Sequence, residues 1–371
     1  MSTKLTDLEG LRAEVRAFVA EELAKGRFEP HCDSWLSGHD PAFSGRLAER
    51  GWLGMTFPKQ YGGHGRSFLE RYVVIEELLA VGAPVAAHWI GDRQSGQLLV
   101  RYGTEEQRQS LLPRIARGEI FFSIGMSEPD SGSDLASVRT SAQKVGGGYV
   151  LNGAKIWTSQ ARHNHYMVTL VRTSPPGSNK HEGLSQVLVD LKGQGVEVRP
   201  IKILSGHEHF NEVVFRDAFV PAEMLVGKEG EGWDQVTSEL AFERSGPERF
   251  LSTFPLLAET VREAGPEPGE ALRTALGRLF ARLRALRALS VGVAGRLQAG
   301  ESPVVEAALV KDRGTLFEQE TIDVLRSVLP PERQSERWRR LYDEAVTHAP
   351  GFTLRGGTNE ILRGIVARAL R

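Results

Sequence analysis

The first third of the chain carries apolar stripes at helical spacing. Between residues 5 and 23, apolar side chains recur at every third or fourth position, which places them on one face of a helix. Residues 68–79 form a second run of this kind, and Thr104, with Gln107 three residues on, opens a third. The pattern predicts a helical N-terminal domain over residues 1–119.

The pattern changes after residue 120. Asn152-Gly153 is a favourable pair for a hairpin turn. Short runs rich in β-branched residues, with Gly, Pro, Asn and Ser between them, cover residues 149–151, 166–171, 186–191, 196–201 and 212–216. Strands this short and closely spaced are typical of a sandwich or small barrel, and not of a parallel sheet with crossover helices. We therefore expect a β-barrel or sandwich over residues 120–227.

The last third returns to helical spacing. Ser302 as a capping residue, with Pro303 at the first helical position, predicts a helix start, and an apolar stripe follows as far as Val328. Pro330-Pro331 ends this helix. A helical C-terminal domain is predicted over residues 228–371. The fold class expected for the whole chain is α+β multidomain, with helices, then strands, then helices again.

Composition and charge narrow the function classes. The 46 Lys and Arg residues balance 47 Asp and Glu residues, which argues against a nucleic-acid-binding protein. The sequence contains no apolar stretch of about 18 residues, so no membrane span is expected. The N-terminus lacks the apolar region of a secretion signal. Cys32 is the single cysteine and excludes an intrachain disulfide framework. A cytoplasmic location is expected.

A polar, turn-rich segment lies where the helical pattern gives way to strands, at residues 123–134. Gly132 and the small hydroxyl side chains of Ser127, Ser131 and Ser133 would let backbone N–H groups approach a pyrophosphate or a ring edge closely. An ordinary turn is the alternative, and composition alone favours it, because Gly, Ser and Asp cluster in many loops.

Trp157 stands directly before two hydroxyl residues, Thr158 and Ser159. A flat ring with donors beside it suits the isoalloxazine ring of a flavin. A tryptophan in the core of a sheet is the commoner explanation of the same pattern.

Glu243 lies in a probable helix with Val236 and Leu240, at positions i, i+4 and i+7. It therefore projects from the apolar side, where a carboxylate is costly unless it is paired. A carboxylate positioned in this way suits a general base. The alternative is a surface glutamate paired with a neighbour, and periodicity does not choose between the two.

Two further features carry less. His163 with His165, and His207 with His209, have a spacing that could bind a metal from one strand face, but no third ligand is evident nearby, so no metal site is expected. The charged run at residues 332–340 is interpreted as a solvated helix face.

The chain resembles the acyl-CoA dehydrogenase family almost from end to end. The motifs that carry the resemblance stand in the family's order: GWLGMTFPKQYGG (51–63), MSEPDSGSD (126–134), NGAKIW (152–157), VFRDAFVP (214–221), LVGKEGEGW (225–233) and GGTNEILR (356–363). The resemblance implies N-terminal helices, a middle β-barrel and a C-terminal four-helix bundle. It also implies α,β-dehydrogenation of an acyl-CoA thioester, with FAD as cofactor and an electron-transfer flavoprotein as electron acceptor.

The resemblance also implies residue roles. Trp157 would pack near the flavin ring and Ser159 near its N5 atom, while Ser133 would contact substrate as well as cofactor. Thr358, Asn359 and Glu360 would meet the other end of the cofactor. The full set of implied FAD contacts is Ile124, Met126, Ser127, Gly132, Ser133, Trp157, Thr158, Ser159, Thr358, Asn359 and Glu360.

The catalytic base is implied by a second branch of the family. Many members carry the base in a Tyr-Glu-Gly-Thr segment, but here Gly356 stands in place of the glutamate. The branch that includes isovaleryl-CoA dehydrogenase places the base in a Leu-x-x-Glu-Arg context, which Leu240, Glu243 and Arg244 match. Glu243 would then remove the α-proton while the β-hydride leaves to flavin N5, and Arg244 would lie near the CoA moiety.

Two segments of the family are missing, and the first of them reaches FAD in a neighbouring subunit in the family. Residues 263–272 lack an Arg-x-x-Phe-Gly match, and residues 330–334 lack a Gly-Gly-x-Gly-Tyr match. Some bacterial members with such losses work as heteromers, so a homo- or hetero-oligomer is expected. Two alternatives stay open: a non-catalytic or half-site subunit of a heteromeric enzyme, and a flavin oxidase on the same fold.

Overall fold

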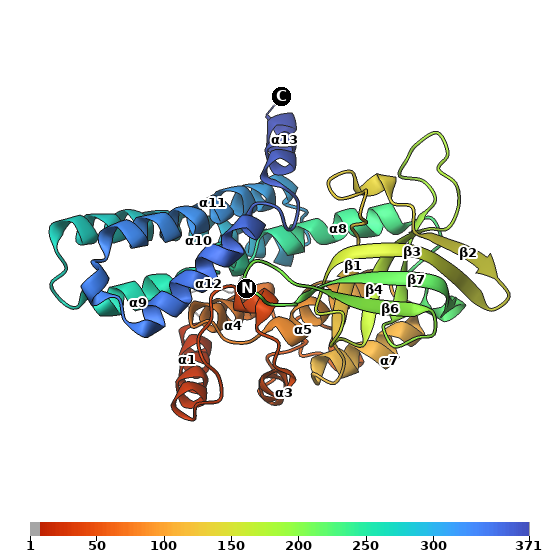
Figure 1. Ribbon diagram of the computed structural model, residues 1–371. Helices are drawn as coiled ribbons and strands as arrows, with labels where there is room; N and C mark the ends of the chain where they lie inside the picture. The colour runs from red at the N-terminus through yellow and green to blue at the C-terminus, as the bar shows by residue number, and fades with distance from the viewer. Residues whose placement is uncertain (1–7, 371) are drawn as a thin grey trace. The chain divides into compact units, whose positions relative to one another are not determined.

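The computed structural model describes residues 8–370, and residues 240–242 by their backbone only. The first residues of the predicted N-terminal helix, 5–7, lie outside this range. The chain packs into two compact units (Figure 1). The helical unit comprises the residues up to Gly38, residues 67–85 and the residues from Ala241 onward, and the sheet unit comprises residues 39–66 and 86–240.

The helical unit is a set of packed helices. They are α1 (Glu9–Ala24), α2 (Ser34–Ser37), α4 (Phe68–Ala80), α9 (Phe254–Ala264), α10 (Glu270–Gln298), α11 (Val304–Val328), α12 (Glu336–Phe352) and α13 (Asn359–Ala369). The long helices α10 and α11 run side by side, and α13 packs against α11 (Figure 1). Along α10, leucines at alternating steps of four and three are buried, namely Leu272, Leu276, Leu279, Leu283 and Leu286. This spacing keeps one apolar stripe against the neighbouring helices.

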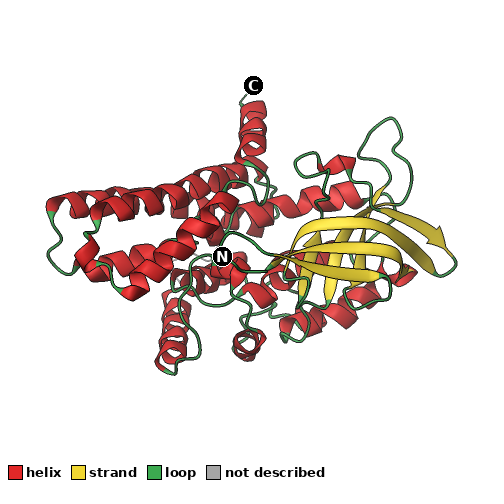
Figure 2. Cartoon of the chain, viewed as in Figure 1, coloured by secondary structure: helices red, strands yellow, loops and turns green. Residues whose placement is uncertain are grey.

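The sheet unit combines four helices with seven strands (Figure 2). The helices are α3 (Pro41–Glu49), α5 (Ala86–Ile90), α6 (Gly96–Tyr102) and α7 (Glu105–Ala116). The strands are β1 (Phe122–Gly125), β2 (Ser141–Val145), β3 (Gly148–Ser159), β4 (Tyr166–Arg172), β5 (Leu184–Asp190), β6 (Val196–Ile201) and β7 (Phe210–Pro221). A further helix, α8 (Gly232–Arg244), begins in the sheet unit, and its last residues belong to the helical unit.

The strands form one curled sheet in the order β1-β4-β2-β3-β7-β6, with β5 paired to β4. Most neighbours are antiparallel, while β1 and β2 each pair with β4 in parallel. The predicted order of helices, strands and helices is therefore confirmed, and so is a sheet without crossover helices. Within residues 8–370, no helix combines the length and the apolar character that crossing a membrane requires.

Local signals placed two helix starts correctly or within one residue. Helix α7 begins after Thr104, whose side chain accepts a hydrogen bond from the N–H of Gln107 while the Gln107 side chain accepts one from the N–H of Thr104. Helix α11 begins at Val304 with Pro303 as its N-cap, so the start predicted with Ser302 as the cap was one residue early. The domain boundaries at residues 119 and 227 stay predictions.

The hairpin turn predicted at Asn152-Gly153 was wrong. Both residues lie inside β3, and the chain turns between β2 and β3 at Gly146-Gly147, where Gly147 has φ 84°. Gly153 instead marks a slip in the pairing of β3 with β7, with φ 144° and Thr140 so close that a Cβ would lie 2.6 Å from its Oγ1 atom. Glycine is needed at this bulge, and an Asn-Gly pair that suits a hairpin turn also suits a bulge.

Candidate functional site

The polar loop at residues 126–134 is held by hydrogen bonds within the loop and by hydrogen bonds to residues outside it. Glu128 and Ser131 exchange two backbone hydrogen bonds of 2.8 and 3.0 Å. The carboxylate of Glu128 is buried, and it accepts hydrogen bonds from the N–H groups of Arg139 and Thr140 and from Nζ of Lys155 at 2.8 Å. The loop is therefore a fixed platform.

The Glu128–Lys155 pair is buried beneath this loop. Lys155 is fully buried, and its Nζ also donates to the carbonyl of Met126. Burial lowers the pKa of Lys155 to about 8, although the carboxylate of Glu128 opposes that shift. Burial opposes ionisation of Glu128 as well, but Lys155 and the two N–H donors hold the pKa of its carboxyl below the ordinary value. Removal of either side chain would leave the charge of the other buried without its ion-pair partner.

Trp157 projects from a second irregularity in β3. The pairing with β7 slips between Lys155 and Thr158, and Trp157 has φ 60°, an unusual backbone conformation for a bulky residue. Its side chain is 54% exposed and meets Phe210 edge to face. The interpretation of Trp157 as a sheet-core residue was therefore wrong. The bulge holds the ring outward, and strain of this kind gathers at functional sites.

The loop and the bulge are joined. The N–H of Ile156 donates to the carbonyl of Ser127 at 2.9 Å, which sets the Ser127 end of the loop beside the base of Trp157. Next to Trp157, Thr158 is fully buried and its Oγ1 has no hydrogen-bond partner among the described residues. Of the sequence-predicted residues in the sheet unit, Ser127 and Thr158 are thus shown to lie next to Trp157 in the fold.

These residues fit a flavin. The ring of Trp157 offers an exposed flat face, and Ser133 and Gly132 are exposed at the tip of the loop. A Cβ at Gly132 would meet no atom within 4 Å, so backbone there is open to close approach. Ile124 and Met126 are half-buried at the end of β1.

The other predicted cofactor contacts lie at the start of α13 in the helical unit. Thr358 caps this helix by accepting a hydrogen bond from the N–H of Ile361, and Glu360 is exposed. Asn359 is buried, and its Oδ1 accepts from Nζ of Lys311 at 2.8 Å. Asn359 thus locks α13 onto α11, whatever else it contacts.

Glu243 lies in the last turn of α8. Its side chain is 23% exposed, and its Oε1 lies 3.4 Å from Nη2 of Arg249. Both sequence interpretations are thus met in part: Glu243 has a charged neighbour, yet its carboxylate still reaches solvent. The side chain of Leu240, which the periodicity argument used, lies outside the described residues.

The segment that carries the base in many acyl-CoA dehydrogenases has a different occupant here. A Cβ at Gly356 would lie 2.8 Å from Nη2 of Arg249, and Gly356 has φ 68°. Arg244 is buried and donates from Nε to the carbonyl of Gly356 at 3.1 Å. Burial lowers the pKa of Arg244, with the charge of Arg249 acting in the same direction and that of Glu243 against it. An arginine pair, and not a carboxylate, fills this place.

Comparisons with known proteins agree with the fold and with these motifs. Models of the acyl-CoA dehydrogenase N-terminal, middle and C-terminal domains match residues 6–119, 123–218 and 257–371. The chain is also 34% identical to the acyl-CoA dehydrogenase IpdE1 of Mycobacterium tuberculosis, over 98% of this chain and 97% of that protein. The chain belongs to the acyl-CoA dehydrogenase family.

Solved structures of acyl-CoA dehydrogenases match this one along its whole length. The Tcur3481-Tcur3483 steroid ACAD has a TM-score of 0.86 and 29% identity, covering 99% of this chain and 98% of that chain. The ChsE4-ChsE5 complex from Mycobacterium tuberculosis has a TM-score of 0.82 and 30% identity, covering 99% and 97%. Family membership makes this protein an FAD-dependent enzyme that dehydrogenates acyl-CoA thioesters.

Sequence reasoning missed a buried polar network that includes Arg355, the residue before Gly356. Asp33 accepts hydrogen bonds from Arg355 and His348, and Arg355 stacks over Trp35. Burial raises the pKa of Glu318 to about 7, although Arg355 counteracts it. These residues are scattered along the chain, so no sequence spacing could have grouped them.

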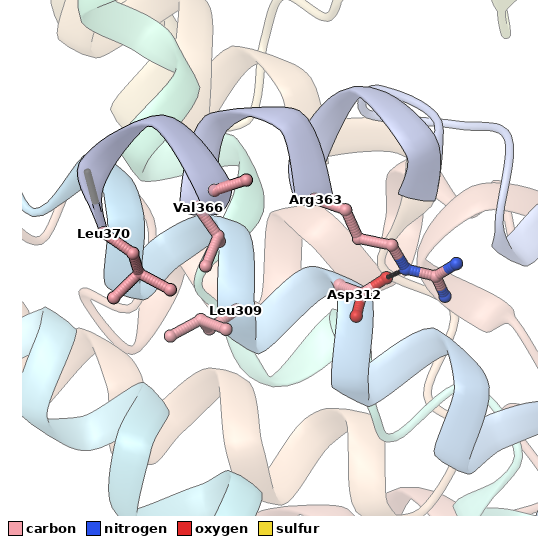
Figure 3. Close-up of a pocket in the computed structure, with 6 residues that line it drawn as sticks. Leu309, Asp312, Arg363, Val366 and Leu370 are labelled. Carbon is pink, nitrogen blue, oxygen red and sulfur yellow. Dashed lines mark hydrogen bonds and ion pairs between the residues drawn. The ribbon is translucent and has the colours of Figure 1, made fainter.

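The described residues form no metal cluster, and the predicted site residues do not line the pocket beside α13. Within residues 8–370, no group of three or more His, Cys, Asp or Glu side chains could hold one metal ion. A shallow pocket of about 170 Å³ lies between α11 and α13, with the Arg363–Asp312 ion pair at one end (Figure 3). None of the predicted site residues lines it.

Proposed function

We propose that Glu243 is the catalytic base of this acyl-CoA dehydrogenase. The observation that carries the proposal is the exchange of roles between two positions: Gly356 offers no carboxylate, while Glu243 presents one that is part-exposed and held beside Arg249. Glu239, one turn earlier on α8, is buried and accepts a hydrogen bond from Gln186. It is therefore occupied as a structural acceptor.

The residues divide the work as follows. Glu243 takes the α-proton of the acyl thioester, and Arg244 lies near the CoA moiety. Ser127, Ser133, Ser159 and the ring of Trp157 would hold the FAD isoalloxazine. FAD, when bound, accepts the β-hydride. A backbone N–H group meets the charge that develops on the thioester oxygen.

Bulky acyl groups are the substrates that we propose to test first. A solved structure that matches 99% of this chain is described as a steroid ACAD. A CoA thioester of a steroid side-chain acid is thus the leading candidate, with short, medium and branched acyl-CoA thioesters for comparison.

We also propose a heteromeric assembly in the cytoplasm. Two family segments are missing from this chain, one of which reaches FAD in a neighbouring subunit in the family, and a matching structure is a complex of two named chains. A partner chain would supply the missing contacts, and an electron-transfer flavoprotein would accept the electrons. Retention of Glu243 argues against a purely structural subunit.

The test is purification of the chain alone and with the product of its neighbouring gene. We expect a flavin absorption spectrum in the co-purified sample and anaerobic bleaching by at least one acyl-CoA thioester. A flavin-free preparation in both samples would favour the non-catalytic subunit. Peroxide release in proportion to substrate under air would identify the oxidase.

A further inference from the structure

At the end of α8, the carbonyl of Glu243 lacks a helical partner. In a continuing helix, the carbonyl of Glu243 would accept a hydrogen bond from the N–H of residue 247. Residue 247 is a proline, which has no N–H. The guanidinium of Arg249 takes its place, donating from Nε at 2.9 Å and from Nη2 at 2.8 Å to the Glu243 carbonyl.

The same guanidinium reaches the side chain of the base. Nη2 of Arg249 lies 3.4 Å from Oε1 of Glu243. This is longer than the roughly 2.8 Å of a tight charge-assisted hydrogen bond. Arg249 thus orients the carboxylate without capturing it, and it fixes both the backbone and the side chain of one residue.

Arg249 is itself held firmly. Its side chain is 2% exposed and lies over the ring of Trp35, with the guanidinium carbon 5.2 Å from the ring centre. Glu248 lies 3.6 Å from its Nε. On another side it packs against Gly356, where even a methyl group would collide with it. An arginine that is ordered in this way can transmit order to its partner.

We propose that Arg249 is the positioning residue for the base Glu243. The inference rests on the proposed function, because it assigns the cause of the geometry of that base. Only the planar guanidinium can donate to the carbonyl through two nitrogens and still lie beside the carboxylate, so lysine would replace it in part. Misplacement of a base by about 1 Å can cost about 100-fold in rate.

The test measures proton removal without the redox step. In the 3-thia analogue of the acyl-CoA that bleaches the flavin fastest, a sulfur replaces the β-carbon, so no β-hydride can leave. The α C–H bond breaks, its electron pair stays on the thioester as an enolate, and the proton passes to the Glu243 carboxylate. In D₂O the carboxylate exchanges this proton and returns a deuteron, and mass spectrometry follows the gain in mass.

Four variants of the assembled holoenzyme separate the roles. We expect Glu243→Gln to slow exchange by at least ~100-fold, Arg249→Met by ~10- to 100-fold, and Arg249→Lys by less than Arg249→Met. The double variant, Glu243→Gln with Arg249→Met, should exchange no more slowly than Glu243→Gln alone, because Arg249 acts through Glu243. Arg287→Met is the matched control, since it removes another guanidinium–carboxylate pair of the helical unit, with Glu76.

The outcomes are distinguishable. If Glu243→Gln is inactive while folded Arg249→Met exchanges within twofold of wild type, the inference fails and the proposed function stands. A further loss in the double variant would also overturn the inference. If wild type does not exchange, or Glu243→Gln exchanges normally, the proposed function fails and the inference with it. Should Arg249→Met not fold, Arg249→Lys carries the same comparison.

Discussion

At the scale of single residues, the site depends on side chains that the fold holds in unusual surroundings. Trp157 is a large aromatic residue with a positive φ and an exposed ring. Arg249 replaces a missing backbone donor and packs against Gly356. The positive φ of Trp157 explains its outward ring, and the missing N–H of Pro247 explains why the Glu243 carbonyl accepts from Arg249.

Trp157→Ala should weaken FAD binding and leave the sheet intact. Loss of one ring-stacking contact costs about 1 kcal/mol, which corresponds to roughly a fivefold to tenfold weaker affinity. Fluorescence titration of the apoprotein with FAD measures this. Phe219→Ala is the control, because Phe219 is also exposed, at 52%, on a strand of the same sheet. Equal FAD affinity in wild type and Trp157→Ala would remove Trp157 from the site.

Glu318 should make stability depend on pH. Burial raises its pKa to about 7, so the folded protein holds a proton that the unfolded chain releases near pH 4.5. The stabilisation is complete below pH 4.5 and is lost as pH rises through 7, by up to about 3 kcal/mol. Glu318→Gln, which is always neutral, should therefore gain stability over wild type between pH 5 and 8. Urea unfolding of both proteins at several pH values tests this prediction. If the free energy of unfolding changes with pH in the same way in both, the assignment to Glu318 is wrong.

At the scale of elements, sequence patterns predicted what is local. Capping at Thr104 and the leucine spacing of α10 depend on neighbours within one turn or two, so they could be predicted from sequence. The bulge at Gly153 could not, because the pairing of β3 with β7 decides it and Asn-Gly suits a hairpin equally well. Arg249 was missed for the same reason, since Trp35 and Gly356 come from distant parts of the chain.

Leu279→Ala in α10 should destabilise the helical unit. Leu279 is 1% exposed in the middle of the buried leucine stripe, and removal of such a side chain costs about 2–5 kcal/mol. Arg278→Ala, the adjacent exposed position, should change stability by less than about 0.5 kcal/mol. Denaturant unfolding measures both. Similar small losses would mean that α10 does not pack through this stripe.

At the scale of the whole molecule, the family fold is present from end to end, and the residues proposed for the cofactor and for catalysis fall in both units. The sheet unit carries the loop and Trp157, whereas Glu243 and the start of α13 belong to the helical unit. The fold class and the enzyme class could be predicted because their motifs are contiguous in sequence. The assembly could not be predicted in this way, because an oligomer interface depends on surfaces and not on contiguous motifs.

Co-purification tests the assembly. We expect the chain alone to bind FAD poorly, and a complex with its partner chain to hold FAD at a defined stoichiometry in light scattering and absorbance. The missing segments at 263–272 and 330–334 are the reason. A monomer that remains saturated with FAD would refute the heteromeric proposal.

The measurement that tests the central claim most directly is anaerobic flavin reduction by Glu243→Gln. The amide is nearly isosteric, so the fold and FAD binding should survive, but it cannot accept the α-proton. We predict at least ~100-fold slower bleaching than wild type with the best acyl-CoA of the panel. Glu239→Gln, a neutralised carboxylate one turn earlier on the same helix, should bleach at a rate close to wild type. If Glu243→Gln bleaches as fast as wild type, Glu243 is a structural residue and the base lies elsewhere.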